Sequence, residues 1–315
     1  MSWTALQVRS LRLEAEDVLG IELAPADATP LPFTWTAGAH VDLRLGNGAV
    51  RQYSLLSLPE EGHLYLGIKR EPASRGGSRW LHEQLRLGAQ IEVSAPRNLF
   101  ALQPGNGPVT LLAAGIGITP LLPMYRQCQA EGRPVRLLYF TRDARQAPFL
   151  QRLGADIQWH GGLRAEQITE QLATEFPAWQ ADAGLYCCGP AGFMRSVEQA
   201  ALKAGWPQAA LYREHFQAPA PTTVDEQSRY ALVLQRSGAE AQVQPGESLL
   251  QAASRVGVEL AYSCGVGICG ACICRVLEGQ PEHRDDCLSE AQRQSGEWIA
   301  PCVSGARSPR LVLDA

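Results

Sequence analysis

Hydrophobic and polar residues alternate in short runs over the first third of the chain. The runs cover residues 6–15, 40–46, 50–57, 63–71 and 90–96, with turn residues between them. Alternation with a period of two is typical of strands that bury one face. The one clear helical pattern here is 78–86, where Leu81 and Leu85 stand four residues apart. Residues 1–104 are therefore predicted to form an antiparallel β-barrel.

Longer apolar runs without alternation begin near residue 108. Runs at 109–115, 135–141 and 185–189 suit strands buried on both faces, and helical patterns such as 121–130 separate them. Repeated alternation of strand and helix favours a parallel sheet. We predict an α/β domain over residues 105–222.

The last part of the chain has a third pattern of hydrophobic and polar residues. Residues 217–228 are rich in Ala, Pro, Thr and charge without an apolar period, which indicates a linker. Residues 230–246 then resemble a β-hairpin, and 248–257 resemble a short helix that Gly257 ends. We predict a separate domain over residues 223–315.

Charge and composition limit the classes of function. The formal net charge is −4, and residues 225–315 carry it, with 12 acidic and 8 basic side chains. No basic face for nucleic acid is visible, although an acidic C-terminal module could dock on a basic protein. The N-terminus has no signal-peptide pattern, and the most apolar window, 109–125, is too short to span a bilayer. A cytoplasmic protein that does not enter the membrane is expected, and there nine cysteines favour metal or redox chemistry over disulfides.

Four of the nine cysteines have the spacing of cluster ligands. Cys264, Cys269 and Cys272 form C-x4-C-x2-C, and Cys302 follows 30 residues later. This is the plant-type ferredoxin spacing for a 2Fe–2S cluster, and the glycines and alanine between the ligands let the backbone wrap closely. A structural zinc site is the main alternative, although it more often shows paired C-x2-C knuckles. Cys274 is expected to be a packing residue rather than a ligand.

Two glycine-containing turns follow apolar runs of the middle domain. The turn AAGIGITP contains Gly115 and Gly117 but is not a G-x-G-x-x-G fingerprint. It can still present backbone amides and a helix N-terminus to an anion. The turn CCGPAGFM contains Cys188, which is equally consistent with a core residue. Since both turns follow strands of one parallel sheet, they could line a common crevice.

Arg51 and Tyr53 share one face of a predicted barrel strand, which places a cation beside an aromatic ring. Such a pair suits a flavin with its phosphate, while a surface cross-strand pair is the alternative. The stretch from Ser74 to Ser78 adds an arginine, two glycines and a serine at a helix start, as in a phosphate-binding nest.

Taken in order, these stretches resemble the phthalate dioxygenase reductase type family, which includes the reductases of vanillate demethylase. The matching stretches are RQYSL, GIKREPASRGGS, PRNLF, AAGIGITP, FTRD, CCGPAGFM, REHF, SCGVGICGAC, HRD and ARSPRLVLD. The resemblance implies a flavin-binding barrel, a nicotinamide-nucleotide α/β domain and a β-grasp 2Fe–2S ferredoxin domain.

The resemblance also implies roles for individual residues. The flavin-binding positions are Arg51, Gln52, Tyr53, Ser54, Ile68, Lys69, Arg75, Gly76, Gly77 and Ser78. The nucleotide-binding positions are Gly115, Gly117, Thr119, Asp143, Cys188 and Gly189. Ser54, Cys188 and Phe216 surround the reacting rings, with Phe216 covering the flavin. Asp143 suits the ribose hydroxyls of NADH and would repel a 2′-phosphate, although Arg142 and Arg145 beside it weaken that inference.

The activity implied is NADH-dependent electron transfer. NADH gives a hydride to a flavin, which the resemblance implies is FMN rather than FAD, and single electrons leave through the 2Fe–2S cluster. The implied partner is a Rieske-type oxygenase, and the protein is expected to be a monomer. A reductase of the same layout that serves a cytochrome P450 or a diiron oxygenase is the first alternative. A cluster-based redox-sensing protein is the alternative from another class.

Overall fold

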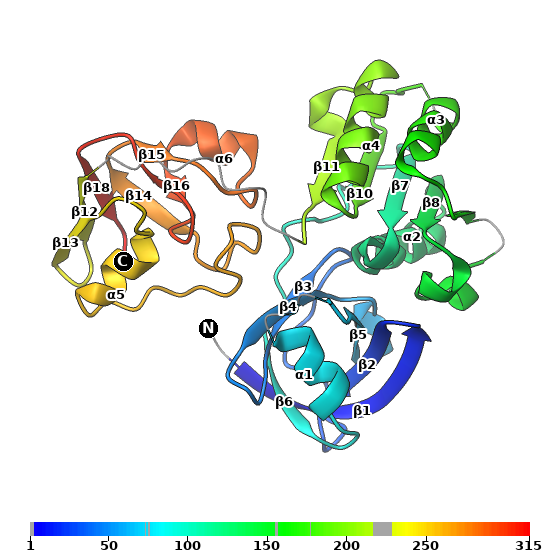
Figure 1. The fold of residues 1–315 in the computed structure, drawn as a ribbon, viewed down its shortest axis with the longest axis horizontal. Coiled ribbons are helices and arrows are strands. Elements are labelled where there is room, and N and C mark those ends of the chain that lie inside the picture. Colours follow the sequence, from blue (N-terminus) through cyan, green and yellow to red (C-terminus); the bar gives the residue numbers. More distant parts are fainter. Residues whose placement is uncertain (1–2, 73, 75, 155–156, 177, 217–228) are drawn as a thin grey trace. The chain divides into compact units, whose positions relative to one another are not determined.

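The chain folds into two compact units, Met1–Phe216 and Gln217–Ala315, which we describe separately. The structure, a computed structural model, describes residues 3–72, 74, 76–154, 157–176, 178–216 and 229–315 (Figure 1). The predicted linker 217–228 lies outside the described residues. Within the described ranges, no helix is both long and apolar enough to cross a membrane.

The first half of unit 1 is an antiparallel barrel of six strands in the order β4-β3-β6-β1-β2-β5. Its strands are β1 (Trp3–Ala15), β2 (Val18–Ala24), β3 (His40–Arg44), β4 (Val50–Ser54), β5 (Leu64–Lys69) and β6 (Gln90–Ser94). A bridge between Leu55 and Leu66 joins the two ends of this order. Alternate residues such as Val41 and Leu43 fill the interior, as the period-two pattern predicts. The helix α1 (Gly77–Gln84) packs on β5, and η1 (Pro59–Glu61) is a short 3-10 turn.

The second half of unit 1 is a parallel sheet in the order β11-β10-β7-β8-β9. Its strands are β7 (Val109–Ala114), β8 (Val135–Thr141), β9 (Gln158–Gly161), β10 (Gly184–Cys188) and β11 (Leu211–Glu214). Its helices are α2 (Ile118–Ala130), α3 (Ala165–Glu175) and α4 (Ala191–Lys203), with 3-10 turns η2 (Gly115–Gly117), η3 (Ala144–Gln146), η4 (Leu150–Arg152) and η5 (Gln208–Ala210). Leu111 and Leu137 face α2, while Leu112 and Leu138 face α3 and α4 on the other side. Both faces of the sheet are therefore covered, as continuous apolar strands require.

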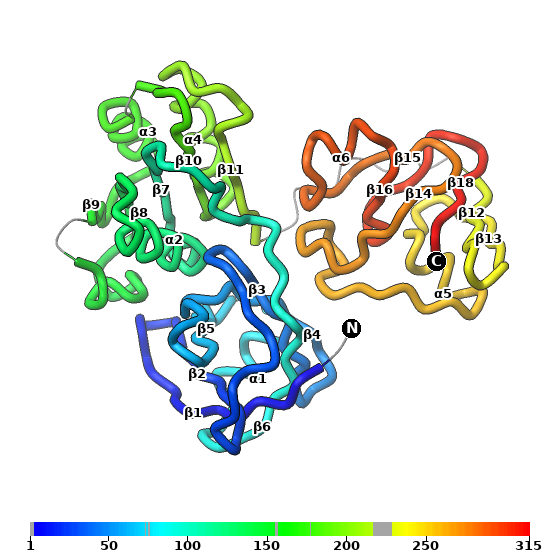
Figure 2. The backbone as a smooth tube through the Cα atoms, turned by 180° about the vertical axis from the view of Figure 1, so that it is seen from behind, coloured from blue at the N-terminus to red at the C-terminus, as the bar shows by residue number. Residues whose placement is uncertain are grey.

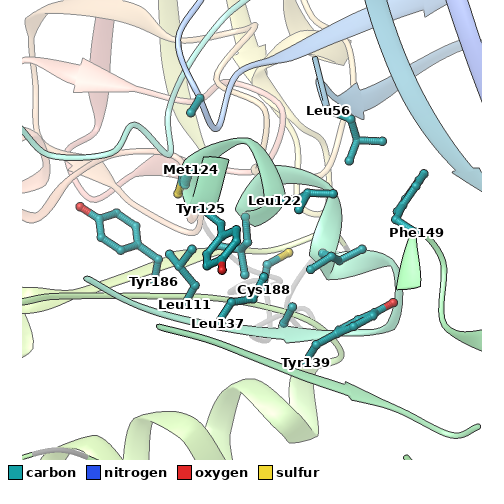
Figure 3. Packing of buried hydrophobic residues seen from close by; sticks show 14 of the residues in the cluster. Leu56, Leu111, Leu122, Met124, Tyr125, Leu137, Tyr139, Phe149, Tyr186 and Cys188 are labelled. Carbon is teal, nitrogen blue, oxygen red and sulfur yellow. The ribbon is translucent and has the colours of Figure 1, made fainter. Parts of the chain in front are cut away.

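The two halves of unit 1 share one hydrophobic core. Leu56 of the barrel belongs to the same buried cluster as Leu122 of α2 and Phe149 (Figure 3). Tyr65 of the barrel is a further member of this cluster. Phe149 adopts a left-handed φ of 64° and packs edge-on against Tyr65, with ring centroids 6.4 Å apart. Arg152 then forms an ion pair with the buried carboxylate of Glu14 and hydrogen-bonds to the hydroxyl of Tyr65 at 3.0 Å. The barrel and the α/β half are thus held together by apolar burial and by charge.

Unit 2 contains a five-stranded sheet in the order β13-β12-β18-β14-β16 and a two-stranded sheet of β15 and β17. Its strands are β12 (Tyr230–Leu234), β13 (Ala239–Val243), β14 (Cys274–Glu278), β15 (Pro281–Glu282), β16 (Trp298–Ile299), β17 (Gly305–Ala306) and β18 (Arg310–Leu313). Its helices are α5 (Leu249–Arg255) and α6 (Glu290–Ser295). β12 pairs with β13 antiparallel and with β18 parallel, and α5 packs on β12 and β13 over a core of its own (Figure 2).

The predicted fold class is confirmed in all three parts. Two differences stand out: α2 begins at Ile118 rather than 121, because the first turn includes Thr119 and Pro120, and the barrel contains a strand, β2, between β1 and β5 that the alternating runs did not include. The pattern missed β9 and β11, since edge strands carry polar residues and lack the apolar run of a central strand. Cys128 of α2 is completely buried in the core of unit 1.

Candidate functional site

Strand β4 presents two different faces to the molecule. Tyr53 pairs across the sheet with Val41 and packs against the barrel core, and Arg51 shares this face. Burial raises the pKa of Tyr53 well above its usual range, so the phenol stays neutral. Gln52 and Ser54 occupy the opposite face, where Ser54 is buried. The predicted flavin residues therefore divide between the two faces of one strand.

Arg51 lies directly against the loop that was expected to bind phosphate. A Cβ atom at position 77 would stand 2.6 Å from the Arg51 side chain, so only glycine permits this approach. Gly76, with a φ of 90°, is the N-cap residue of α1, and Ser78 accepts a hydrogen bond from the backbone N–H of Glu71 at 3.2 Å. This guanidinium beside a helix N-terminus and a glycine pair fits a phosphate group. Arg75 lies outside the described residues.

The remaining predicted flavin residues, Gln52, Ile68 and Lys69, differ in burial and in hydrogen bonding. Gln52 has a buried side-chain oxygen, Oε1, that accepts no hydrogen bond from the described residues. A bound ring with N–H groups would satisfy this acceptor, which supports the fit of a flavin. Ile68 is fully buried in the barrel core and its carbonyl lies 2.8 Å from Nε2 of His82, so its contact with a flavin stays a prediction. Lys69 is half-exposed and lies 4.0 Å from Asp17.

The two glycine turns of the α/β half lie in direct contact. Strands β7 and β10 are parallel neighbours, with Ala113 opposite Cys188. A Cβ atom at position 117 would stand 2.2 Å from the carbonyl oxygen of Cys188, and Gly115 has a positive φ of 56°. The two turns expected to line a common crevice are therefore neighbours at the carboxyl ends of these strands, and the crevice itself stays a prediction.

Two predicted nucleotide residues already have partners within the chain. The hydroxyl of Thr119 donates to the carbonyl of Ile116 at 2.9 Å, and its methyl group faces Gly67 of the barrel. Asp143 caps η3 by accepting from the backbone N–H groups of Arg145 and Gln146 at 2.8 and 3.0 Å through Oδ1. Its second oxygen, Oδ2, lies 3.7 Å from the Arg145 guanidinium, so one carboxylate oxygen is oriented by the cap while the other meets a cation.

Ser54 and Cys188 meet a third polar residue that the sequence analysis did not select. Glu214 stands opposite Cys188 on the neighbouring strand β11, and Ser54 Oγ donates a long hydrogen bond of 3.5 Å to its carboxylate. Burial raises the pKa of Glu214 to about 8, and the bond from Ser54 offsets part of this effect. Burial also raises the pKa of Cys188, and its thiol lies in the shared core. Only the pairing of β10 with β11 brings Glu214 to this place.

Two further predicted site residues, Gly189 and Phe216, follow Cys188 and Glu214 closely in the sequence. Gly189 packs closely on Ala114, because a Cβ there would stand 2.8 Å from the Ala114 methyl group. Phe216, two residues beyond Glu214, leaves 40% of its surface exposed. An exposed aromatic beside the junction of the two halves agrees with its expected role as a cover, although its contact with a cofactor stays a prediction.

The four predicted ligand cysteines of unit 2 gather as two pairs. Cys272 and Cys302 approach to 3.3 Å between their sulfur atoms, and Cys264 and Cys269 hydrogen-bond to one another. The bond from Cys269 lowers the pKa of Cys264 to about 5, and the bond from Cys302 lowers the pKa of Cys272. One sulfur of each pair is thereby favoured as a thiolate, the form that binds iron.

Two pairs of sulfurs match the needs of a cluster with two irons, each taking two cysteine ligands. Within the described ranges, no three or more His, Cys, Asp or Glu side chains gather around a single-ion site. Backbone N–H groups also point at the sulfurs: Val266 donates to Cys264 and Ala271 to Cys269, each at 3.4 Å. The donor set and its surroundings fit a 2Fe–2S cluster better than the alternative zinc ion.

Comparisons with known proteins agree with this geometry. Residues 232–307 match the model of the 2Fe-2S iron-sulfur cluster binding domain. The chain is 41% identical over 307 residues to a vanillate O-demethylase oxidoreductase of Pseudomonas putida, covering 96% of both chains.

Two solved structures are also similar over nearly the whole chain. Phthalate dioxygenase reductase is 32% identical with a TM-score of 0.72, covering all of this chain and 98% of that one. An intact type IV self-sufficient cytochrome P450 monooxygenase is 32% identical with a TM-score of 0.89, and the match covers 99% of this chain but only 41% of that longer one. With its two pairs of cysteines and its Gly117 turn packed against Cys188, the chain belongs to the family of phthalate dioxygenase and vanillate demethylase reductases.

Proposed function

We propose that this chain carries electrons from NADH to the Rieske centre of a separate oxygenase, acting as a cytoplasmic monomer. The chain is an oxidoreductase of the kind that serves multicomponent oxygenase systems, and its cofactors are FMN, NADH and a 2Fe–2S cluster. The relatives support an oxygenase as the partner, and the proposal adds that this oxygenase is of the Rieske type. It is supported by the likeness to phthalate dioxygenase reductase and to vanillate demethylase reductase over full length.

When bound, the flavin supplies the change from a two-electron donor to a one-electron acceptor. The chain's own residues hold and orient the reactants. Arg51 and the loop that ends at Ser78 would hold the flavin phosphate, and Gln52 would accept from the ring. The amides of the turn at Gly115 and Gly117 would hold the nucleotide pyrophosphate.

Ser54, Cys188 and Glu214 would line the place where the two rings meet. Burial raises the pKa of Glu214 to about 8, which favours the protonated, neutral form of this carboxyl where the two rings would meet. A neutral carboxylic acid can donate a hydrogen bond there without placing a negative charge against an incoming hydride.

The observation that carries the proposal is the pairing of the cysteines. The replacement Cys302→Ser breaks the pair with Cys272 and removes one of four ligands. We expect the variant to reduce ferricyanide with NADH at a normal rate and to lose at least tenfold of its cytochrome c reduction. Cys274→Ser is the matched control, since Cys274 begins β14 beside the pairs and is not a member of either. Full cytochrome c reduction by the Cys302 variant would contradict the proposed path.

The identity of the partner is tested by reconstitution. NADH oxidation is measured with a Rieske oxygenase and, in parallel, with a cytochrome P450. The P450 is the second candidate because the self-sufficient P450 chain contains a closely similar module. Faster coupled turnover with the P450 would favour that candidate and overturn the Rieske assignment.

A further inference from the structure

A buried carboxylate stands between the two cysteine-bearing segments of unit 2. The side chain of Asp285 is fully buried, although Asp285 is neither a predicted ligand nor part of the sheet. Burial of a charge is costly unless hydrogen bonds and counter-charges compensate it. Its position therefore requires an explanation from its contacts.

The carboxylate of Asp285 joins two separate pieces of chain. Its Oδ2 accepts from the backbone N–H of Leu288 at 3.0 Å, and its Oδ1 accepts from the hydroxyl of Ser304 at 3.0 Å. Ser304 lies two residues after Cys302, and its own backbone N–H donates to the carbonyl of Ala300 at 3.0 Å. The hydrogen bond to Ser304 thus ties Asp285 to the turn that carries the fourth cysteine.

The segment of Asp285 and Asp286 also contacts the loop that carries Cys264 and Cys269. The backbone N–H of Asp286 donates to the carbonyl of Gly267 at 2.9 Å, midway between Cys264 and Cys269. A Cβ atom at position 267 would stand 3.2 Å from the Cα of Asp285 and 2.7 Å from the side chain of Val303. Gly267 is therefore enclosed between Asp285 and the segment of Cys302.

Three neighbours surround the charge of Asp285. The Nη2 of Arg293 lies 4.0 Å from Oδ2 and donates to the backbone carbonyl of Asp285. His283 Nδ1 lies 3.7 Å from Oδ1, and neither ring nitrogen of His283 hydrogen-bonds within the described residues. Cys287 Sγ lies 3.6 Å from Oδ2, and burial together with this carboxylate raises the pKa of Cys287, so it stays a neutral thiol.

We propose that Asp285 is a positioning residue for the cluster, which fixes the separation of the two cysteine segments and holds a negative charge beside them. This inference rests on the proposed 2Fe–2S site. Groups behind the ligands orient them, and the net charge nearby is one of the factors that set a cluster's reduction potential. Asp285 performs both tasks through one carboxylate.

Two variants separate the tasks. Asp285→Asn keeps the shape, removes the charge and places an N–H₂ group against one of the two donors. Asp285→Ala leaves the N–H of Leu288 and the hydroxyl of Ser304 without an acceptor. Asp286→Asn is the matched control, because it removes an exposed carboxylate one residue away that lies 3.9 Å from the same Arg293 guanidinium, while its backbone N–H still bonds to Gly267.

The experiment uses the full-length holoprotein and measures cluster absorbance, cluster loss to a chelator and the midpoint potential by an EPR-monitored titration. We expect Asp285→Ala to lose its cluster at least tenfold faster than wild type. We expect Asp285→Asn to retain cluster and to favour the reduced form about tenfold, a positive shift of about 59 mV for a one-electron couple. Asp286→Asn should match wild type in chelator resistance.

Wild-type cluster retention and potential in both Asp285 variants would overturn the inference, and so would an equal shift in Asp286→Asn. If Asp285→Asn loses part of its cluster and the remaining cluster has the wild-type midpoint potential, Asp285 has a packing role and the electrostatic role is overturned. Failure of the proposed function is distinguishable, since the wild-type protein would then pass no electrons to a Rieske oxygenase while its cluster and the effects of the Asp285 variants remained measurable.

Discussion

The protonation of Glu214 has a measurable consequence for stability. The pKa of this carboxyl rises from an ordinary 4.5 to about 8 in the folded chain, because burial disfavours its charged form. A folded state that binds the proton more tightly is stabilised below pH 4.5 and loses this stability as the pH rises towards 8. Replacement by glutamine, which cannot ionise, removes the dependence. Glu214→Gln should therefore gain stability relative to wild type as the pH is raised.

The magnitude follows from the size of the shift. Each pH unit between the two pKa values corresponds to about 1.36 kcal/mol, so raising the pH from 6 to 9 changes the wild-type free energy of unfolding by at most roughly 2.7 kcal/mol. Glu214 is only partly buried, and solvent screening reduces this figure to about half. In a unit of this size, that difference corresponds to a change in Tm of about 3–6 °C.

Thermal unfolding of the holoprotein, followed by flavin fluorescence at pH 6 and pH 9, measures the effect. The Tm of Glu214→Gln minus that of wild type should be about 3–6 °C larger at pH 9. Glu131→Gln, an exposed carboxylate at the end of α2, is the control and should show the same difference at both pH values. The reasoning is refuted if Glu214→Gln behaves like this control.

Three further substitutions test the nucleotide site and the shared core of unit 1. Gly117→Ala places a methyl group 2.2 Å from the Cys188 carbonyl oxygen, so the KM for NADH should rise at least tenfold, whereas Gly154→Ala, with open space around it, should leave KM unchanged. Phe149→Ala removes a buried ring and should lower the free energy of unfolding of unit 1 by about 3–5 kcal/mol in urea titrations; a loss below 1 kcal/mol would contradict the shared core. Asp143→Ala should reduce the preference for NADH over NADPH in kcat/KM and cost about 1 kcal/mol through the lost cap, and an unchanged cofactor ratio would remove Asp143 from the selectivity argument.

The sequence predicted what depends on local pattern and spacing. Period-two alternation predicted the barrel, continuous apolar runs predicted β7, β8 and β10, and the spacing of the cysteines predicted the metal site. It did not predict which cysteines would pair, because Cys302 reaches Cys272 only through the fold of the segment between them.

What the sequence could not predict depends on neighbours that are distant along the chain. Glu214 lies on an edge strand of mixed polarity, so neither the strand nor its position beside Cys188 is visible from local pattern. Alternation also does not say whether the side chain of a strand residue such as Ile68 faces the barrel core or a bound cofactor. In the structure, Ile68 is buried in the barrel core. Asp285 is similar, since only its contact with Ser304 reveals a role.

The shared core of unit 1 also limits how this protein can be divided and reused. A cut between the barrel and the α/β half would expose Leu56, Tyr65, Leu122 and Phe149 to water together, so neither fragment is expected to remain folded alone. Unit 2 keeps its own core and carries all four cysteines of the two pairs. Gene fusions and domain exchanges should therefore succeed when they move unit 2, or the whole chain, as a single cassette, and fail when they split the flavin half from the nucleotide half.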